Sequence, residues 1–209
     1  MASPGRIRVL CVDDHPLVRD GIAFALEQPN DMELVATAEN GEEAIELFRT
    51  FRPDVTLMDL QMPGMNGIDA MAAIRKDFPH AKIVMLTTYS GDIQASRALK
   101  QGAVGYLLKA TLRKELIDTI RCVHAGQRRI PPEIAAQIAE HFNADALSSR
   151  EIEVLKCVAA GRSNKIVADR LFISEDTVKA HLKNVFAKLQ ANDRTHAVMI
   201  AIKRGFLDG

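Results

Sequence analysis

The stretch Arg8-Val9-Leu10-Cys11-Val12-Asp13-Asp14 joins an almost entirely apolar run to a pair of acidic residues. An apolar run of this length without alternation indicates a short β-strand that is covered on both faces. Such strands belong to parallel sheets flanked by helices, in which ligands bind beyond the carboxyl ends of the strands. We therefore expect the acidic pair to lie at the ligand-binding edge of a sheet.

Four further runs of this kind follow within the first 125 residues. We expect strands at Glu33-Leu34-Val35-Ala36-Thr37, Asp54-Val55-Thr56-Leu57-Met58, Lys82-Ile83-Val84-Met85-Leu86 and Gly105-Tyr106-Leu107-Leu108. Segments of helix length lie at 15–27, 41–50, 67–77, 91–101 and 111–125. Pro16 suits the first turn of a helix, with Asp14 as a candidate N-cap. Five strand–helix units predict an α/β domain with a doubly wound, five-stranded parallel sheet.

No strand pattern follows residue 125. Residues 126–145 contain a glycine, two arginines and the Pro131-Pro132 pair, which is typical of a linker, and a short helix is expected from Glu133 to His141. Helical patterns then occupy 148–160, 163–171, 174–189 and 194–204, with candidate N-caps at Ser148, Ser163 and Ser174. We therefore predict an α/β domain at 6–125, a linker with a short helix at 126–145 and an all-α domain of four helices at 146–209.

The formal net charge is zero, but the charged residues are unevenly distributed. Residues 1–125 carry 14 basic and 17 acidic side chains, whereas residues 146–209 carry 11 and 7. An acidic first part and a basic last part predict two domains with different partners. The composition, 47% hydrophobic and 26% charged, supports folded cores and excludes a disordered chain.

Composition also bears on the expected location. The cysteines, Cys11, Cys122 and Cys157, are widely spaced, which predicts neither a disulfide framework nor a structural zinc site. The longest apolar run, Ala197 to Ile202, has six residues, too few to span a membrane. No secretory signal is visible at the N-terminus. We expect a cytoplasmic protein without a membrane partner.

Reactive side chains follow four of the five predicted strands. They are Asp13 and Asp14 after the first strand, Asp59 after the third, Thr87 after the fourth and Lys109 after the fifth. Each residue alone is most simply a turn, cap or surface residue, but together they form a site at one sheet edge. Three carboxylates repel one another unless a cation joins them, and Mg²⁺ prefers oxygen ligands. A cation, a hydroxyl and an ammonium around a carboxylate stabilise a phosphoryl group that moves onto it, so we predict phosphorylation of an aspartate.

The same residues carry a resemblance to a known family. Residues 7–124 resemble a response-regulator receiver domain through Val12-Asp13-Asp14-His15, Leu57-Met58-Asp59-Leu60-Gln61-Met62-Pro63-Gly64, Leu86-Thr87 and Gly105-Tyr106-Leu107-Leu108-Lys109. The resemblance implies that Asp59 is the phosphoacceptor and binds Mg²⁺ together with Asp13, Asp14 and the backbone carbonyl of Gln61. It also implies that Lys109 binds the phosphoryl oxygens and that Thr87 and Tyr106 form a switch. Ala110 stands where many receivers have proline, which leaves the isomer of the Lys109–Ala110 bond open.

Residues 174–189 have the most informative helical pattern. Val178, Leu182, Val185 and Leu189 recur on one face, and Lys179, Lys183, Asn184 and Lys188 occupy the other side. The helical segment before it, 163–171, is followed by a tight turn around Phe172-Ile173. Two short helices joined in this way predict a helix-turn-helix whose second helix enters the major groove of DNA. The alternative is a helical interaction bundle with a solvated basic face.

Three segments resemble the LuxR-type helix-turn-helix, over residues 146–207. They are Leu147-Ser148-Ser149-Arg150-Glu151-Ile152-Glu153-Val154-Leu155, Gly161-Arg162-Ser163-Asn164-Lys165-Ile166-Val167-Ala168 and Ile173-Ser174-Glu175-Asp176-Thr177-Val178-Lys179-Ala180-His181-Leu182-Lys183-Asn184-Val185. The resemblance implies that Lys179, Ala180 and Lys183 face base edges, and that Thr177, Asn184 and Lys188 contact phosphates. The role of His181 is left open. Ala197, Val198, Ala201 and Ile202 form a stripe that is either core or a dimer interface.

Together the two resemblances identify the chain as a member of the NarL/FixJ family of response regulators. They imply a transcription factor of a two-component system, in which a sensor histidine kinase phosphorylates Asp59 and thereby controls binding to double-stranded DNA. The expected cofactor is Mg²⁺, and the further expected partners are a second copy of the chain and RNA polymerase. We do not expect an enzyme, because aspartyl-phosphate hydrolases of the dehalogenase type carry a second Asp where this chain has Gln61. A phosphate-independent DNA-binding protein with a degenerate receiver is disfavoured by the intact strand-end residues.

Overall fold

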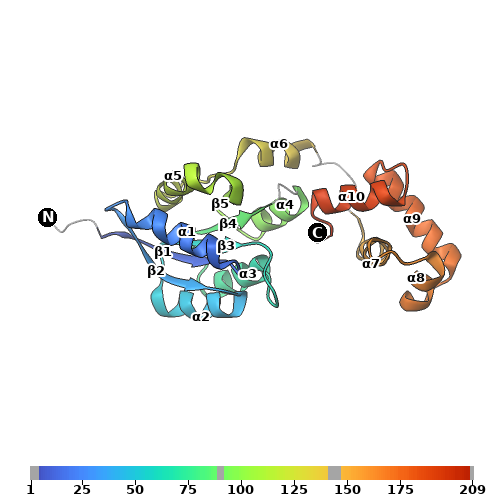
Figure 1. Cartoon of the computed structure of the whole chain (residues 1–209), viewed down its shortest axis with the longest axis horizontal. Coiled ribbons are helices and arrows are strands. Elements are labelled where there is room, and N and C mark those ends of the chain that lie inside the picture. Colours follow the sequence, from blue (N-terminus) through green and yellow to red (C-terminus); the bar gives the residue numbers. More distant parts are fainter. Residues whose placement is uncertain (1–4, 89–91, 141–146, 208–209) are drawn as a thin grey trace. The chain divides into compact units, whose positions relative to one another are not determined.

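The computed structural model describes residues 5–88, 92–140 and 147–207, and Figure 1 shows its elements. The strands are β1 (Ile7–Val12), β2 (Met32–Ala38), β3 (Val55–Asp59), β4 (Ile83–Thr87) and β5 (Gly105–Leu108). They alternate with α1 (Pro16–Glu27), α2 (Gly41–Phe51), α3 (Gly67–Asp77), α4 (Asp92–Lys100), the 3-10 turn η1 (Lys109–Thr111) and α5 (Leu112–His124). The remaining helices are α6 (Pro132–Glu140), α7 (Ser149–Ala159), α8 (Asn164–Leu171), α9 (Glu175–Leu189) and α10 (Arg194–Arg204). The chain forms two compact units, whose boundary falls within α6.

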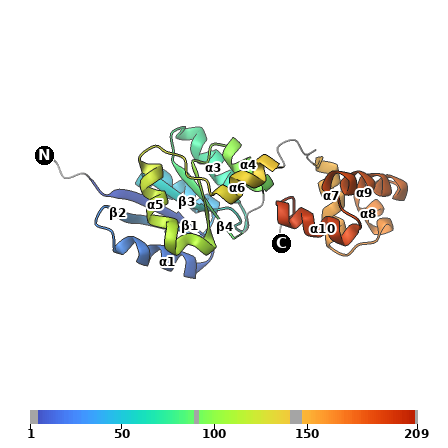
Figure 2. The same cartoon turned by 90° about the horizontal axis from the view of Figure 1, so that it is seen from above.

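The first unit is built on a parallel sheet with the strand order β2-β1-β3-β4-β5. Helices α1 and α5 contact each other, α2 contacts α3, and Figure 2 shows the sheet between α1 and α3. The inner strands β3 and β4 are buried along their whole length, as their apolar sequences predict. The predicted doubly wound α/β fold is therefore confirmed.

The expectation of burial on both faces is wrong for one strand. In β2 the residues from Glu33 to Val35 are only partly buried and Thr37 is exposed. The reason is its position, because β2 lies at the edge of the sheet and pairs only with β1. A short apolar run does not by itself distinguish an edge strand from a central one.

The start of α1 also differs from the prediction. Pro16 lies in its first turn as expected, but the N-cap is His15 and no side chain accepts a capping hydrogen bond. The prediction of Asp14 as the cap is wrong, because its carboxylate Oδ1 lies 2.7 Å from Nδ1 of His15 instead. Within the described residues every peptide bond is trans, which answers the question about the Lys109–Ala110 bond.

The segment that follows α5 adds to the sheet edge. Arg129 forms a parallel bridge with Gly105; its carbonyl accepts a hydrogen bond from Tyr106 N (2.8 Å) and its N–H donates to the carbonyl of Val104 (3.1 Å). Ile134, at the start of α6, is fully buried, and the compact unit that contains the sheet extends to Ala135. The first ten residues of the predicted linker thus belong to the compact unit of the sheet, which they contact through Arg129. The domain limits at 125 and 145 stay a prediction.

The second unit contains α7 to α10, which enclose an apolar core of their own. Ser148 forms the expected capping box with Glu151, and Ser163 and Ser174 cap α8 and α9 as predicted. The apolar face predicted for 174–189 is the core face, since Val178, Leu182, Val185 and Leu189 are all buried. Of the predicted stripe on α10, Ala197 and Ala201 are buried, whereas Val198 and Ile202 are partly exposed. Among helices in the described ranges, none combines the length and apolarity needed to cross a membrane.

Candidate functional site

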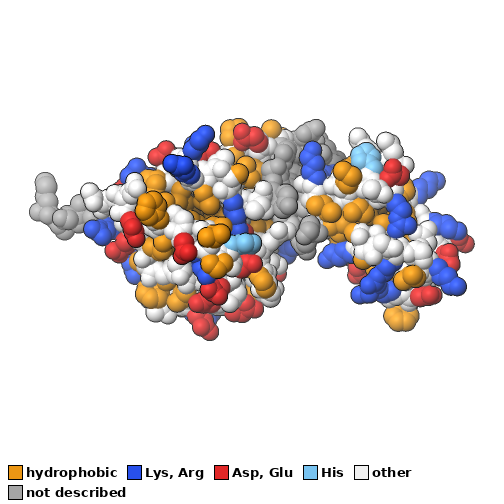
Figure 3. Space-filling view, in the orientation of Figure 1, with side chains coloured by type: hydrophobic (Ala, Val, Ile, Leu, Met, Phe, Trp, Pro, Cys, Tyr) orange, Lys and Arg blue, Asp and Glu red, His pale blue; other side chains and the backbone are white. Residues whose placement is uncertain are grey.

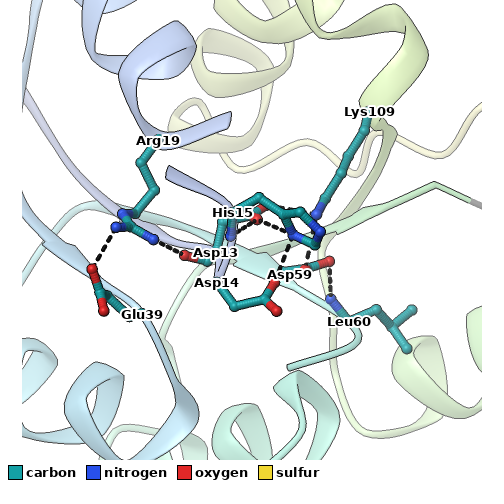
Figure 4. Close-up of polar contacts among 8 residues, drawn as sticks. All are labelled: Asp13, Asp14, His15, Arg19, Glu39, Asp59, Leu60 and Lys109. Carbon is teal, nitrogen blue, oxygen red and sulfur yellow. Dashed lines mark hydrogen bonds and ion pairs between the residues drawn. The ribbon is translucent and has the colours of Figure 1, made fainter. Parts of the chain in front are cut away.

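Three charged side chains from the ends of three strands meet at the carboxyl edge of the sheet, as Figure 4 shows. Asp13 follows β1, Asp59 is the last residue of β3 and Lys109 follows β5. The ammonium Nζ of Lys109 lies 2.8 Å from Asp13 Oδ2 and 2.9 Å from Asp59 Oδ2. Both carboxylates are buried. One cation therefore partly neutralises two acids that the sheet topology brings together.

Burial is the largest influence on the ionisation of this cluster. It raises the pKa of Asp59 to about 6, against the lowering effect of the hydrogen bond from Lys109 and with a further rise from Asp13. Burial lowers the pKa of Lys109, but its contacts with the carboxylates of Asp13 and Asp59 outweigh this effect, and the net change is upward. Lys109 thus stays an ammonium at neutral pH, beside an Asp59 carboxylate whose charge is poorly solvated.

The loop after β3 holds the backbone of Asp59 tightly. Leu60 N donates hydrogen bonds to Asp59 Oδ1 (2.8 Å) and to the carbonyl of Leu86 (3.0 Å). Gly67, the first residue of α3, packs so closely that a Cβ atom there would lie 1.9 Å from the carbonyl oxygen of Asp59. A glycine is needed at this contact, because it lets the start of α3 pack directly against the backbone of Asp59.

The acidic residues fit a divalent cation. Asp13, Asp14, His15 and Asp59 each offer a ligand atom, and these atoms lie within 4.8 Å of one another. Asp13 Oδ2 and Asp14 Oδ1 are buried and accept no well-oriented hydrogen bond, although Lys109 Nζ and His15 Nδ1 lie close to them. Carboxylate oxygens with unused lone pairs are the ligands that Mg²⁺ prefers. Gln61, two residues after Asp59 in the sequence, is exposed, and metal binding by its carbonyl stays a prediction.

Thr87 and Tyr106, the two residues of the predicted switch, lie on the neighbouring strands β4 and β5 and are both buried. Burial raises the pKa of Tyr106 to about 12, and hydrogen bonding to Thr87 lowers it only in part. The Tyr106 hydroxyl does not reach full hydrogen-bond geometry with any protein group in the described ranges, so its contact with Thr87 is a weak one. The two hydroxyls are adjacent, as a paired role requires, and that role stays a prediction.

Two residues of this site, His15 and Arg19, are missing from the set predicted from sequence. The backbone N–H of His15 donates to Asp13 Oδ1 (2.9 Å), and its ring Nδ1 lies 3.2 Å from the same atom. Arg19 donates from Nη1 to the carbonyl oxygen of Asp13 (2.7 Å) and from Nη2 to Glu39 Oε1 (Figure 4). The sequence does hold a signal for Arg19, because side chains in the first turns of a helix lean toward its N-terminus, here toward the strand end.

The helix-turn-helix is formed by α8 and α9, with the turn at Phe172. Figure 3 shows Lys and Arg side chains spread over the visible face of the helical unit. The exposed residues of α9 include five of the six that were predicted to contact DNA, namely Thr177, Lys179, Ala180, Lys183 and Asn184. These five side chains are exposed, although Lys179 Nζ lies 2.9 Å from Asp176 Oδ1. Their contacts with DNA stay a prediction.

Lys188, the sixth predicted DNA contact, has a partner inside the unit. Its Nζ lies 2.9 Å from Oε2 of the buried Glu151, and the same Oε2 accepts a hydrogen bond from Ser148 N (2.7 Å). Burial raises the pKa of Glu151, but the hydrogen bonds from Lys188 and Ser148 outweigh it, so the pKa is lowered. This contact ties the last turn of α9 to the first turn of α7.

Comparison with known proteins identifies both units. Residues 9–121 match the response regulator receiver domain, and residues 145–201 match the bacterial regulatory proteins of the luxR family. The first match alone covers more than half of the chain. This chain is a response regulator of the NarL/FixJ family.

Relatives of this response regulator share its whole length. It is 40% identical over 213 residues to the uncharacterized transcriptional regulatory protein YxjL of Bacillus subtilis, covering 97% of this chain and 98% of that protein. It is 37% identical over 206 residues to the response regulator protein VraR of Staphylococcus aureus, covering 96% and 99%. A solved RcsB–DNA complex has a TM-score of 0.70 at 25% identity, over 95% of this chain and 99% of that chain. The predicted family, fold and function as a DNA-binding response regulator are confirmed, and its receiver implies a histidine kinase as partner.

Proposed function

We propose that this response regulator accepts a phosphoryl group on Asp59 from a sensor histidine kinase, and that this modification controls DNA binding by α9. The observation that carries the proposal is the buried Asp59 carboxylate, 2.9 Å from Lys109 Nζ and within the acidic cluster of Asp13 and Asp14. A buried carboxylate next to a fixed cation and further acidic residues is arranged for a charged substrate group rather than for stability.

In the transfer step, an Asp59 carboxylate oxygen forms a bond to phosphorus while the bond from phosphorus to the kinase imidazole nitrogen breaks. The electron pair of the broken bond returns to the imidazole. Lys109, already oriented by Asp13, stabilises the negative charge on the phosphoryl oxygens. Asp13, Asp14, Asp59 and the carbonyl of Gln61 would hold Mg²⁺, which would supply further positive charge to those oxygens.

The phosphorylated Asp59 carries about two negative charges at the sheet edge. The Thr87 hydroxyl, at the end of the neighbouring β4, donates to the phosphoryl group, and the space it leaves is taken up by a movement of the adjacent Tyr106. The outcome is a changed surface around β5, the strand whose edge contacts the segment leading to the DNA-binding unit.

For DNA recognition we propose that α9 lies in the major groove, with Lys179, Ala180 and Lys183 at base edges and Thr177 and Asn184 at phosphates. RcsB, which has a similar fold, has been solved in complex with DNA, and this supports DNA binding by the present chain. We further propose that the active form is a homodimer that meets RNA polymerase on DNA in the cytoplasm. For Lys188 a structural role is favoured, because Glu151 holds its ammonium.

The proposal is tested by Asp59→Asn. Wild-type protein incubated with acetyl phosphate and Mg²⁺ is expected to gain one phosphoryl group by intact mass and to bind a DNA selected from a random pool more tightly. Asp59→Asn should show neither change, whereas Asp77→Asn, at an exposed surface ion pair with Arg49, should behave like the wild type. Donor-dependent activation that persists in Asp59→Asn would refute the proposal.

A further inference from the structure

Arg19 is a largely buried cation beside the phosphorylation site that the transfer step does not use. Its side chain is 13% exposed although it lies on α1, a surface helix. The guanidinium bridges two loops, because it donates to the carbonyl oxygen of Asp13 after β1 and to the carboxylate of Glu39 after β2. Glu39 in turn lies beside α2, since its N–H donates to Glu43 Oε2 (2.8 Å).

The carbonyl that Arg19 binds belongs to the peptide between the two acidic residues. A peptide unit is planar, so holding the Asp13 oxygen also sets the orientation of the Asp14 N–H and the position of the Asp14 Cα, from which its side chain departs. The N–H of Asp13 is fixed from the other side by the carbonyl of Ala38 at 3.1 Å. Arg19 and β2 together therefore fix the backbone of the acidic pair.

The positive charge of Arg19 and its hydrogen bonds have opposite effects on a cation that binds to the acidic pair. A positive charge near the site repels an incoming cation, but Glu39 forms an ion pair with the guanidinium and offsets its charge. The two directed hydrogen bonds remain. Lysine in place of Arg19 keeps the charge and loses the fork of donors, whereas glutamine loses both.

We propose that Arg19 is a positioning residue for the acidic pair Asp13–Asp14, which holds the β1–α1 loop in the geometry that binds the divalent cation. The proposal rests on the metal site of the proposed function. Groups that orient metal ligands without touching the metal change affinity by about 10- to 100-fold when removed. We expect that range for Arg19→Gln.

The test is a titration with Mn²⁺ in the absence of phosphodonor, with free Mn²⁺ measured by its EPR signal. Arg19→Gln should raise the dissociation constant at least 10-fold, and Glu39→Gln and Arg19→Lys should raise it less. Arg49→Gln is the matched control, because Arg49 also pairs with a carboxylate (Asp77, 2.7 Å) but on the surface and away from the strand ends. Its affinity should equal that of the wild type.

The outcomes separate the positioning role from the proposed function. Wild-type protein that binds no Mn²⁺, or Asp13→Asn that binds as well as wild type, contradicts the proposed metal site. Normal wild-type binding with unchanged or tighter binding by Arg19→Gln overturns only the role of Arg19. If Arg19→Gln does not fold, as judged by circular dichroism, Arg19→Lys and Glu39→Gln decide, and wild-type affinity in both refutes the inference.

Discussion

Asp59 and Lys109 illustrate how much a single residue depends on its surroundings. Lys109 is 50 positions from Asp59 in sequence, yet its ammonium is the closest cation to both Asp59 and Asp13 among the ion pairs of the described site. The raised pKa of Asp59 is therefore a consequence of burial that one lysine, shared between two acids, does not fully offset. A carboxyl group whose pKa is higher in the folded than in the unfolded state favours folding at low pH, and this contribution is lost as the pH rises through the folded pKa.

For Asp59 we predict a titration midpoint near pH 6 in metal-free protein, against 3.8 for an unperturbed side chain. Addition of Mg²⁺ should move the midpoint downward, because a bound cation favours the carboxylate. Carboxyl ¹³C NMR of protein labelled at aspartate measures both values, and Asp59→Asn identifies the signal by its loss. A midpoint near 4 without metal would contradict the stated effect of burial.

The main expected effect of Lys188→Ala is a loss of stability of the DNA-binding unit, not a loss of DNA affinity. The substitution leaves Glu151 buried without its cation, at a cost of about 1–3 kcal/mol in the free energy of unfolding, less than for a fully buried pair because the Lys188 side chain is 26% exposed. Urea unfolding measures the loss, with Lys183→Ala on the exposed side of α9 as the matched control, expected within about 0.5 kcal/mol of wild type.

The pH dependence of the stability of the DNA-binding unit is a second test of the contact between Lys188 and Glu151. The pKa of Glu151 is lowered from 4.5 by Lys188 and Ser148 despite burial. The stabilisation is therefore complete above about pH 4.5 and is lost as the pH falls through the lower, folded value. Lys188→Ala should flatten that decline, and an equal acid dependence in variant and wild type would argue against the pair.

At the scale of whole elements, packing between neighbours sets requirements that propensity alone does not reveal. The start of α3 approaches the end of β3 so closely that only glycine fits at position 67. By contrast, Gly21 in α1 has no atom within 4 Å of the position of an added Cβ. The two glycines look alike in the sequence, and only the distance between elements separates them.

Gly67→Ala is predicted to destabilise the receiver by about 1–3 kcal/mol, because the backbone must move to relieve the overlap with Asp59. Gly21→Ala should instead stabilise it by about 0.5–1 kcal/mol, since alanine is the better helix former. Denaturant unfolding compares the two. Gly67→Ala should also slow phosphorylation of Asp59, and an unperturbed Gly67→Ala would show that the loop is not held as described.

A substitution at Ile134 tests whether the segment after α5 stabilises the receiver. The Ile134 side chain is fully buried within the unit that contains the sheet, and truncation of a buried isoleucine costs about 2–5 kcal/mol. Ile134→Ala should therefore lower the stability of the receiver, measured as its unfolding transition in the full chain. Leu17→Ala, at a position that is 86% exposed, is the control and should change it by less than about 0.5 kcal/mol.

For the whole molecule, the division of charge matches the division of function. The first 125 residues have three more acidic than basic residues, and the last 64 have four more basic than acidic ones. Neutrality of the total therefore says nothing about DNA binding, because the positive excess is concentrated in one unit. The acidic excess of the other unit includes the three carboxylates of the proposed phosphorylation site.

DNA affinity should accordingly fall steeply with salt, by about 0.9 in log–log slope per neutralised phosphate. Lys179→Ala is expected to cost about 1–3 kcal/mol on a DNA selected from a random pool, if Lys179 reads a base. Lys203→Ala, an exposed lysine on α10, serves as the control. Fluorescence anisotropy over a salt series measures both the salt slope and the affinity loss of Lys179→Ala. An equal loss on random DNA would show that Lys179 contacts the DNA backbone.

The sequence alone determined the order of strands and helices, the strand-end acids and the buried face of α9. These features follow from short-range periodicity and from the rule that parallel strands share one ligand-binding edge. None of these features depends on which side chains contact one another. The predicted positions of Asp13, Asp59 and Lys109 at one edge agree with the structure for that reason.

Only the tertiary structure decided the individual contacts. The sharing of Lys109 between two acids, the bridge from Arg19 to Glu39, the pairing of Lys188 with Glu151 and the addition of Arg129 to β5 all join segments distant in sequence. Each depends on side-chain direction and on distances between packed elements, which residue types and spacing do not specify. The edge position of β2 and the contact of the Asp14 carboxylate with His15, in place of a helix cap, belong to the same class, because both depend on how neighbouring elements pack.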